Sequence, residues 1–228
     1  MRACSEPEIH PTAARERLNR VLTWLAAVVV AIAVCWSPDS EALGLFSTAA
    51  REAVDRVLSG GPSASKTVAA AGRLEVAFSP KEGAEALVLK AVGSAQAEIC
   101  VMAYTFNSAP VTKALLAAVH RGVKVRMVVD QKNNLTQDTS GKARAALGAL
   151  HNAGAEVRTI GAYQIAHDKV MVIDGRHVEL GSFNYSASAE HRNSENVLVN
   201  WDNPDLAAVY RRHFDRNYRL SEAFEPRY

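Results

Sequence analysis

Short apolar runs alternate with alanine-rich amphipathic stretches along the chain from residue 73 onward. The runs LEVAF, EICVMAYTF and VKVRMVVD are rich in β-branched and aromatic residues, which favour strands. Between them, GAEALVLKAVGSA and APVTKALLAAVHRG carry apolar residues at helical spacing. This order predicts an α/β fold. Because VRMVV is apolar on both faces, we expect helices to cover both faces of a mixed or parallel sheet.

The second half of the chain predicts two more helices and four more strands. A helix is expected from about 142 to 153, followed by the strand AEVRTI. Residues 169–173 and 177–180 predict two strands joined at Asp174-Gly175, a dipeptide that favours a tight hairpin turn. The strand ENVLVNW then precedes a terminal helix that begins near Pro204. The polar, breaker-rich segment 130–141 is expected to be a mobile loop at the rim of a site.

An apolar segment without charged residues spans 21–36 and follows three arginines. This pattern is typical of an export signal, and small residues permit cleavage after Ala42. We therefore expect 1–42 to be the signal peptide of an exported protein, periplasmic or secreted. An uncleaved membrane anchor is the alternative, because tilt or flanking residues could extend the span. Residues 43–72 predict a flexible spacer, which places the folded domain at 73–228.

Composition narrows the function classes only slightly. The chain has 228 residues, of which 26 are basic and 24 acidic, so its net charge is +2 with the histidines neutral. Such a balance does not by itself indicate a nucleic-acid or membrane-surface protein. The three cysteines are too few and too scattered for a disulfide framework or a CxxC metal site. Cys100 lies in an apolar run and is expected to be buried.

One short segment concentrates the candidate chemistry. The sequence HDKVMVIDGRHVELGSFN carries six specified residues at the spacing H-x-K-x4-D-x6-G-S-x-N, namely His167, Lys169, Asp174, Gly181, Ser182 and Asn184. His167 and Lys169 are two residues apart on a strand, so their side chains emerge on the same face. After the turn the chain returns antiparallel and brings Ser182 and Asn184 to the same region. These groups suit a phosphate diester, which needs one nucleophile and several hydrogen-bond donors.

This spacing resembles the signature of the phospholipase D superfamily. From about Glu75 to Tyr218 the chain is similar to the small bacterial endonucleases of that superfamily that carry a single motif, through MAYTF, ELGSFNYS and NSENVLV. The resemblance implies a phosphodiesterase that needs no metal or other cofactor, in which His167 attacks phosphorus and forms a phosphohistidine. It also implies a homodimer with a shared active site, since the family needs two motifs per site and this chain has one.

The resemblance further implies a role for each residue. The phosphate-binding residues are Lys169, Ser182 and Asn184. Glu195 matches the carboxylate that hydrogen-bonds the catalytic imidazole. For Asp174 we expect a structural role rather than direct proton transfer, because its spacing places it at the turn. Gly181 is expected to leave room for the substrate to approach the backbone.

The substrate stays open at this point. Similarity to the small nucleases favours nucleic acid, DNA or RNA, cleaved without strong sequence preference through backbone contacts. A phospholipid of the phosphatidylcholine type is the alternative, because the same motif hydrolyses such diesters. Four arginines of the terminal helix do not decide between them, and we expect a solvated helix surface there rather than a nucleic-acid patch. They are Arg211, Arg212, Arg216 and Arg219.

Two other classes of function are disfavoured. An inactive nucleic-acid-binding module would need a damaged motif, and all six motif positions are intact. Metal-dependent hydrolysis would need a recognisable set of ligands. The sequence has no HExxH, no clustered histidines and cysteines, and no close pair of carboxylates.

Overall fold

The computed structural model describes residues 65–226 of the chain. The expected signal or anchor segment, 1–42, and most of the expected spacer, 43–72, lie outside the described residues. The first strand begins at Arg73. Within 65–226, no helix combines the length and the apolar character needed to cross a membrane.

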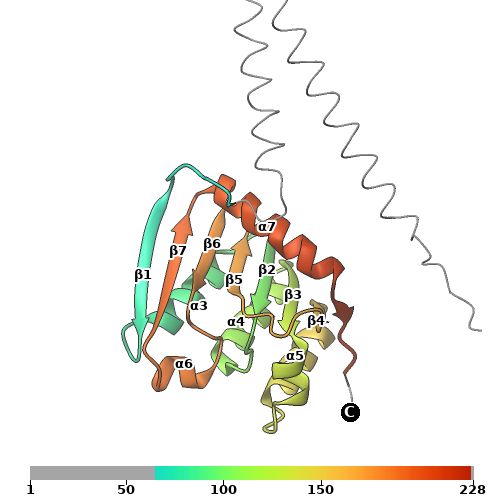
Figure 1. Ribbon diagram of the computed structural model, residues 1–228. Coiled ribbons are helices and arrows are strands. Elements are labelled where there is room, and N and C mark those ends of the chain that lie inside the picture. Colours follow the sequence, from blue (N-terminus) through green and yellow to red (C-terminus); the bar gives the residue numbers. More distant parts are fainter. Residues whose placement is uncertain (1–64, 227–228) are drawn as a thin grey trace, which may run out of the picture. The chain divides into compact units, whose positions relative to one another are not determined.

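Strands and helices alternate along the described residues except between 156 and 181, where strands follow one another without a helix (Figure 1). The strands are β1 (Arg73–Ser79), β2 (Glu98–Ala103), β3 (Lys124–Asp130), β4 (Glu156–Ile160), β5 (Lys169–Ile173), β6 (His177–Gly181), β7 (Glu195–Trp201) and β8 (Glu222–Ala223). The helices are α3 (Ala84–Ser94), α4 (Ala109–His120), α5 (Lys142–Asn152), α6 (Ala187–His191) and α7 (Pro204–Arg219), with a π-helical turn η1 (Lys132–Thr136). The strands and helices expected from the sequence are confirmed, whereas α6, η1 and β8 were not expected.

The eight described strands form one mixed sheet in the order β1-β7-β6-β5-β2-β3-β4-β8. β2, β3 and β4 run parallel to one another, and each is joined to the next by a helix, as parallel neighbours require. The remaining neighbours are antiparallel. β1 is an edge strand paired with β7, although more than 100 residues separate them in the chain. The expected mixed sheet is therefore confirmed.

Helices cover both faces of this sheet (Figure 1). Beneath α3, α4 and α5, the sheet buries Val101, Met127 and Met171 in one hydrophobic cluster. α7 lies across the other face, where its Phe214 packs in a second cluster with Val172 of β5. Side chains on both faces of the central strands are thus buried, which explains why these strands read as continuous apolar runs. The predicted α/β fold is confirmed.

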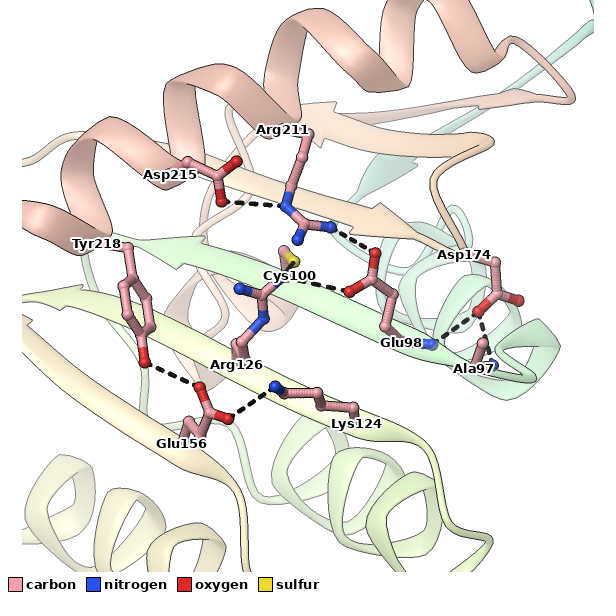
Figure 2. Close-up of polar contacts among 10 residues, drawn as sticks. All are labelled: Ala97, Glu98, Cys100, Lys124, Arg126, Glu156, Asp174, Arg211, Asp215 and Tyr218. Carbon is pink, nitrogen blue, oxygen red and sulfur yellow. Dashed lines mark hydrogen bonds and ion pairs between the residues drawn. The ribbon is translucent and has the colours of Figure 1, made fainter.

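Asp174 and Gly175 form the tight turn between β5 and β6. Three residues separate the paired Ile173 and His177, and the first two of them, Asp174 and Gly175, have φ angles of +52° and +63°, in the left-handed region. The Asp174 carboxylate accepts hydrogen bonds of 2.8–2.9 Å from the backbone N–H groups of Gln96, Ala97 and Glu98. Figure 2 shows the bonds from Ala97 and Glu98. Burial alone would raise the pKa of this carboxyl, but the three backbone bonds outweigh burial and lower the pKa. Asp174 thereby fixes the hairpin to the start of β2.

Ion pairs join α7 to the sheet (Figure 2). The Glu98 carboxylate on β2 accepts from Arg211 of α7 and, at 3.2 Å, from Arg126 of β3. Arg126 also donates to Sγ of Cys100 at 3.4 Å, and burial raises the pKa of this thiol to about 11. Cys100 is the buried thiol that the sequence predicts. The expectation for Arg211 was wrong, because this side chain forms part of a helix–sheet contact and not of a solvated surface.

The first half of the segment 130–141 is not the loop that its composition predicts, whereas 137–141 form neither helix nor strand and are mostly exposed. The first half contains η1, and Asp130 and Asn134 are only 2% and 1% exposed. Asn134 Nδ2 donates to the main-chain oxygens of Tyr104 at 2.6 Å and Asp130 at 2.8 Å, and its Oδ1 accepts from the Phe106 N–H at 2.8 Å. The prediction was wrong for this half because a polar side chain that satisfies buried backbone groups has the same sequence appearance as a loop residue.

Candidate active site

Apart from Asp174, which lies at the opposite end of β5, the motif residues lie at one edge of the sheet, where the ends of four strands meet. β2 ends at this edge and β5 begins there, because the antiparallel register pairs Ala103 with Lys169. β6 ends and β7 begins at the same edge, where Gly181 pairs with Val197. The two halves of the motif and the segment that carries Glu195 therefore come together through strand register alone.

His167 lies two residues before the start of β5, and this residue is exposed to solvent. The ring of Tyr104, which follows β2, lies 4.6 Å from the imidazole and is tilted by 59°. The backbone on both sides of the histidine is held in place. The Ala166 N–H donates to Oδ2 of the buried Asp130 at 2.8 Å, and the Asp168 carbonyl accepts from the Tyr104 N–H at 2.8 Å. An accessible imidazole thus stands on a well-fixed backbone.

Lys169 is a buried cation beside this imidazole. The residue is 7% exposed, and its Nζ donates to the carbonyl oxygen of His167 at 3.0 Å. The same ammonium lies 5.3 Å from the centre of the Tyr104 ring. Burial lowers the pKa of Lys169, although the carboxylates of Glu195 and Asp168 act in the opposite direction. A positive charge in such a weakly solvated position attracts a nearby anion more strongly than one in open water.

Ser182 and Glu195 contribute a hydroxyl and a carboxylate to the same edge. The Ser182 hydroxyl donates to Oε2 of Glu195 at 2.6 Å, and Asn193 Nδ2 donates to Oε1 at 2.8 Å. Oγ of Ser182 also accepts from the Asn196 N–H at 3.1 Å. Both oxygens of Glu195 thus have donors, and no hydrogen bond among the described residues joins Glu195 to His167. The expected carboxylate–imidazole bond is absent within this single described chain.

Gly181 is packed tightly against β7, and Asn184 lies beyond β6 with a buried side-chain oxygen. A Cβ atom at Gly181 would lie 2.1 Å from the carbonyl oxygen of Asn196 on β7. The expectation that this glycine leaves room for substrate is wrong, because the protein's own main chain fills the space. Asn184 lies beyond β6, and its Oδ1 is buried without a hydrogen-bond partner among the described residues. Such atoms are rare in folded proteins, which marks Asn184 as unusual.

Asp168, between the two motif side chains, contacts α7. Nε2 of His213 lies 3.2 Å from both carboxylate oxygens of Asp168, and Asn217 Nδ2 donates to Oδ2 at 3.3 Å. Arg216 lies 2.9 Å from Nδ1 of His213. Because an arginine can only donate, Nδ1 accepts and Nε2 carries the proton that is donated to Asp168. No sequence motif marks His213, because this contact depends on how α7 packs.

The converging groups suit phosphate chemistry. They are an exposed imidazole, a buried ammonium, a hydroxyl and a hydrogen-bonded carboxylate, so the site offers a nucleophile and a fixed positive charge. Among residues 65–226, no three histidine, cysteine, aspartate or glutamate side chains lie close enough together to hold a metal ion.

The fold and this set of groups suit the cleavage of phosphodiesters, and comparison with known proteins identifies the family. Residues 88–218 match the family model described as cardiolipin synthase, PLD-like domain. The chain belongs to this family of phosphodiesterases, within the phospholipase D superfamily. The sequence resemblance is thereby confirmed.

Individual relatives carry different names. The chain is 36% identical over 138 residues to "Phospholipase D" of Rickettsia conorii. This match covers 60% of this chain and 66% of that protein. It is 33% identical over 129 residues to "Mitochondrial cardiolipin hydrolase" of Xenopus laevis, which covers 57% of this chain and 56% of that protein. The chain thus spans slightly less than two thirds of the first of these curated relatives and just over half of the second.

Solved structures show the same fold. Nuc from Salmonella typhimurium, described as a phospholipase D family member, is 37% identical, with a TM-score of 0.64. The match covers 67% of this chain and 98% of Nuc. NucT from Helicobacter pylori has a TM-score of 0.59 at 23% identity, which is a likeness of fold alone.

Proposed function

We propose that this protein cleaves nucleic acid without a metal, through a phosphohistidine intermediate. The observation that carries the proposal is the exposed imidazole of His167 and the buried ammonium of Lys169, which both lie against the ring of Tyr104. The imidazole attacks phosphorus, and the bond from phosphorus to the leaving oxygen breaks. Lys169, Ser182 and Asn184 stabilise the charge on the non-bridging oxygens. Water then attacks the phosphohistidine, which releases the phosphate product and restores the imidazole.

The leaving oxygen needs a proton, and this chain carries one HxK motif. We propose a symmetric homodimer in which His167 of the partner subunit donates that proton and later acts as the base for water. The contacts of Glu195 support this arrangement. Because Glu195 makes no bond to His167 within one chain, the carboxylate that fixes the imidazole tautomer would come from Glu195 of the partner subunit.

An exposed apolar stripe beside the site supports the homodimer. Leu74, Val76 and Phe78 alternate along the edge strand β1 and are 62%, 51% and 50% exposed. The residues of β1 between these three, such as Ala77, pack under α3, so the stripe faces the side of the sheet on which α7 lies. α7 does not extend over β1, so it leaves the stripe uncovered (Figure 1). Phe78 pairs with Asn196 at the active-site edge, and Val76 pairs with Leu198. A second copy seated here would cover the stripe and reach the site.

Nucleic acid is the substrate that the structural likeness favours. The chain resembles the small endonucleases of the superfamily, and the family member Nuc aligns with it over 98% of its own length at 37% identity, so almost the whole of Nuc has a counterpart here. Phospholipid is the second candidate, because the similar Rickettsia proteins are named phospholipase D and a Xenopus relative is named a cardiolipin hydrolase.

The test compares the wild-type protein with His167→Ala and His167→Asn on single-stranded DNA, duplex DNA, RNA and phosphatidylcholine vesicles. We expect the wild type to cleave nucleic acid and both variants to lose at least about 1,000-fold in kcat. A covalent phosphate on the protein should be trapped in the wild type and be absent from His167→Ala. His120→Ala is the control, because His120 is exposed at the far end of α4.

Two results would change the proposal. Wild-type turnover by His167→Ala would eliminate the phosphohistidine mechanism. Turnover of vesicles without cleavage of any nucleic acid would keep the mechanism and replace the substrate by phospholipid.

A further inference from the structure

A groove of about 680 Å³ lies between α4, α5 and α6, on the side of the sheet opposite α7. Its volume falls within the range of about 300–1,000 Å³ that is usual for ligand sites. Its floor is apolar and includes Leu116 of α4 with Ala145 and Ala146 of α5. Basic side chains on its rim are Lys113, Lys142 and His191. We refer to it as the helical groove.

The rim of the helical groove carries an excess of positive charge. Lys113 and Lys142 are exposed, and neither ammonium forms an ion pair with a carboxylate among the described residues. The one carboxylate that lines the groove, Glu85, accepts a hydrogen bond from the Ser108 hydroxyl at 3.1 Å. His191 adds a third group that binds anions when protonated. The lysine charges are therefore available to a ligand.

The helical groove begins beside the candidate active site. On one wall, the N–H groups of Asn107 and Ser108 both donate to the carbonyl oxygen of Tyr185 at 2.9 Å, and Tyr185 directly follows the motif asparagine. On the other rim, His191 stands two residues before Asn193, which donates to the carboxylate of the site. A substrate chain that leaves the reacting phosphate could thus continue directly into the groove.

We propose that the helical groove binds the nucleic-acid strand next to the scissile phosphate, with Lys113 and Lys142 each contacting a backbone phosphate. This inference rests on the proposed function. The position of the charges favours nucleic acid over lipid. Phosphatidylcholine has one phosphate, which the catalytic centre takes, whereas a nucleic acid carries a negative charge at every nucleotide. The alanine floor contacts sugars and bases without reading their sequence.

The first test removes the two lysine charges. Lys113→Gln combined with Lys142→Gln is compared with Lys90→Gln combined with Lys124→Gln, a control that removes two exposed lysines already paired with carboxylates elsewhere. The substrates are single-stranded DNA of about 20 nucleotides and bis(p-nitrophenyl) phosphate. The second substrate is too small to extend from the catalytic centre into the helical groove. We expect kcat/KM on the DNA to fall about 10-fold. The slope of log(kcat/KM) against the logarithm of the salt concentration should become less steep by about 1.4, because two phosphate contacts are lost. Turnover of the small diester should not change.

The second test changes the sign of an introduced charge. Ala145 is exposed on the floor of the groove, so a larger side chain is tolerated there without disturbing the core. Ala145→Glu should weaken binding of a fluorescent single-stranded oligonucleotide, and Ala145→Lys should strengthen it. A general disturbance of the fold would move both variants in the same direction.

The outcomes separate this inference from the proposed function. If the double lysine variant and the control bind the oligonucleotide equally, the groove proposal is wrong even when catalysis is confirmed. Equal losses on the DNA and on the small diester would also overturn it, because the lysines would then act on the catalytic centre. If the wild type hydrolyses neither the DNA nor the small diester, the proposed function fails, while the binding assay still decides the role of the groove.

Discussion

The ring of Tyr104 lies 4.6 Å from the imidazole of His167, and the Lys169 ammonium lies 5.3 Å from the centre of the same ring. One aromatic side chain at the end of β2 therefore contacts both basic residues of the motif. The face of the ring stabilises the ammonium, and its bulk limits rotation of the imidazole.

Tyr104→Ala should lower kcat on bis(p-nitrophenyl) phosphate by about 10- to 100-fold, since a small misplacement of a reacting group has effects of that size. Tyr104→Phe keeps the ring and should stay close to the wild type. Steady-state kinetics with both variants, alongside their melting temperatures, check this. If Tyr104→Phe loses as much activity as Tyr104→Ala, the hydroxyl and not the ring is what matters.

The part of the site that sequence predicts is the part encoded locally. His167, Lys169, Asp174 and the turn that ends at Arg176 fall within ten residues, so strand periodicity and turn chemistry suffice to place them. The contact of Asp168 with His213 spans 45 residues and depends on where α7 packs. No periodicity in the sequence encodes such a contact.

The same reasoning explains the errors around η1. Asn134 contacts Tyr104 across 30 residues, and its polar neighbours hide the fact that it is buried. The pairing of β1 with β7 is also long-range, so the exposed stripe on β1 emerges only from the sheet order.

Asn134→Ala should reduce the free energy of unfolding by about 3 kcal/mol, because it leaves buried backbone groups of Tyr104, Phe106 and Asp130 without their partner. Urea denaturation measures the change. Asn133→Ala is the control, since only the backbone N–H of Asn133 bonds to Asp130. Equal stability of the two variants would show that the Asn134 bonds contribute little.

Glu179 predicts a pH dependence of stability. This residue is 1% exposed, and burial raises its pKa to about 8 although the Tyr185 hydroxyl donates to it at 2.6 Å. In the unfolded chain the carboxyl loses its proton near its ordinary pKa of 4.5. Between these values the folded state holds more protons than the unfolded state. Stability should therefore fall as pH rises through this window, by up to about 1.4 kcal/mol per pH unit.

Glu179→Gln keeps the shape and the acceptor for Tyr185 but cannot ionise. The measurement is the free energy of unfolding of both proteins at about pH 5 and about pH 7.5. We expect the variant to gain stability relative to the wild type at the higher pH. Parallel pH profiles would mean that Glu179 titrates normally in the folded protein.

Activity should survive removal of divalent metals. The nucleophile and the positive charge of the proposed reaction both come from side chains, so no Lewis acid is needed. The measurement is turnover of the small diester after dialysis against EDTA. Loss of turnover that magnesium or zinc restores would contradict the proposed mechanism.

The dimer predicts that charging the stripe on β1 separates the subunits and removes activity. Val76 is 51% exposed, so Val76→Lys should fold, because edge strands tolerate lysine. Leu220→Lys is the matched control, since Leu220 is 50% exposed just after α7, away from β1. Sedimentation should show a dimer for the wild type and for Leu220→Lys, and a monomer for Val76→Lys.

The loss of activity in Val76→Lys should follow from the loss of the second imidazole. Mixing His167→Ala subunits with wild-type subunits tests this separately, because each heterodimer carries one motif histidine and should turn over far more slowly than the wild-type dimer. Lys169 and the fold remain intact in both experiments, so a slow heterodimer isolates the shared histidine. A Val76→Lys monomer with full activity would instead require a second proton donor within one chain.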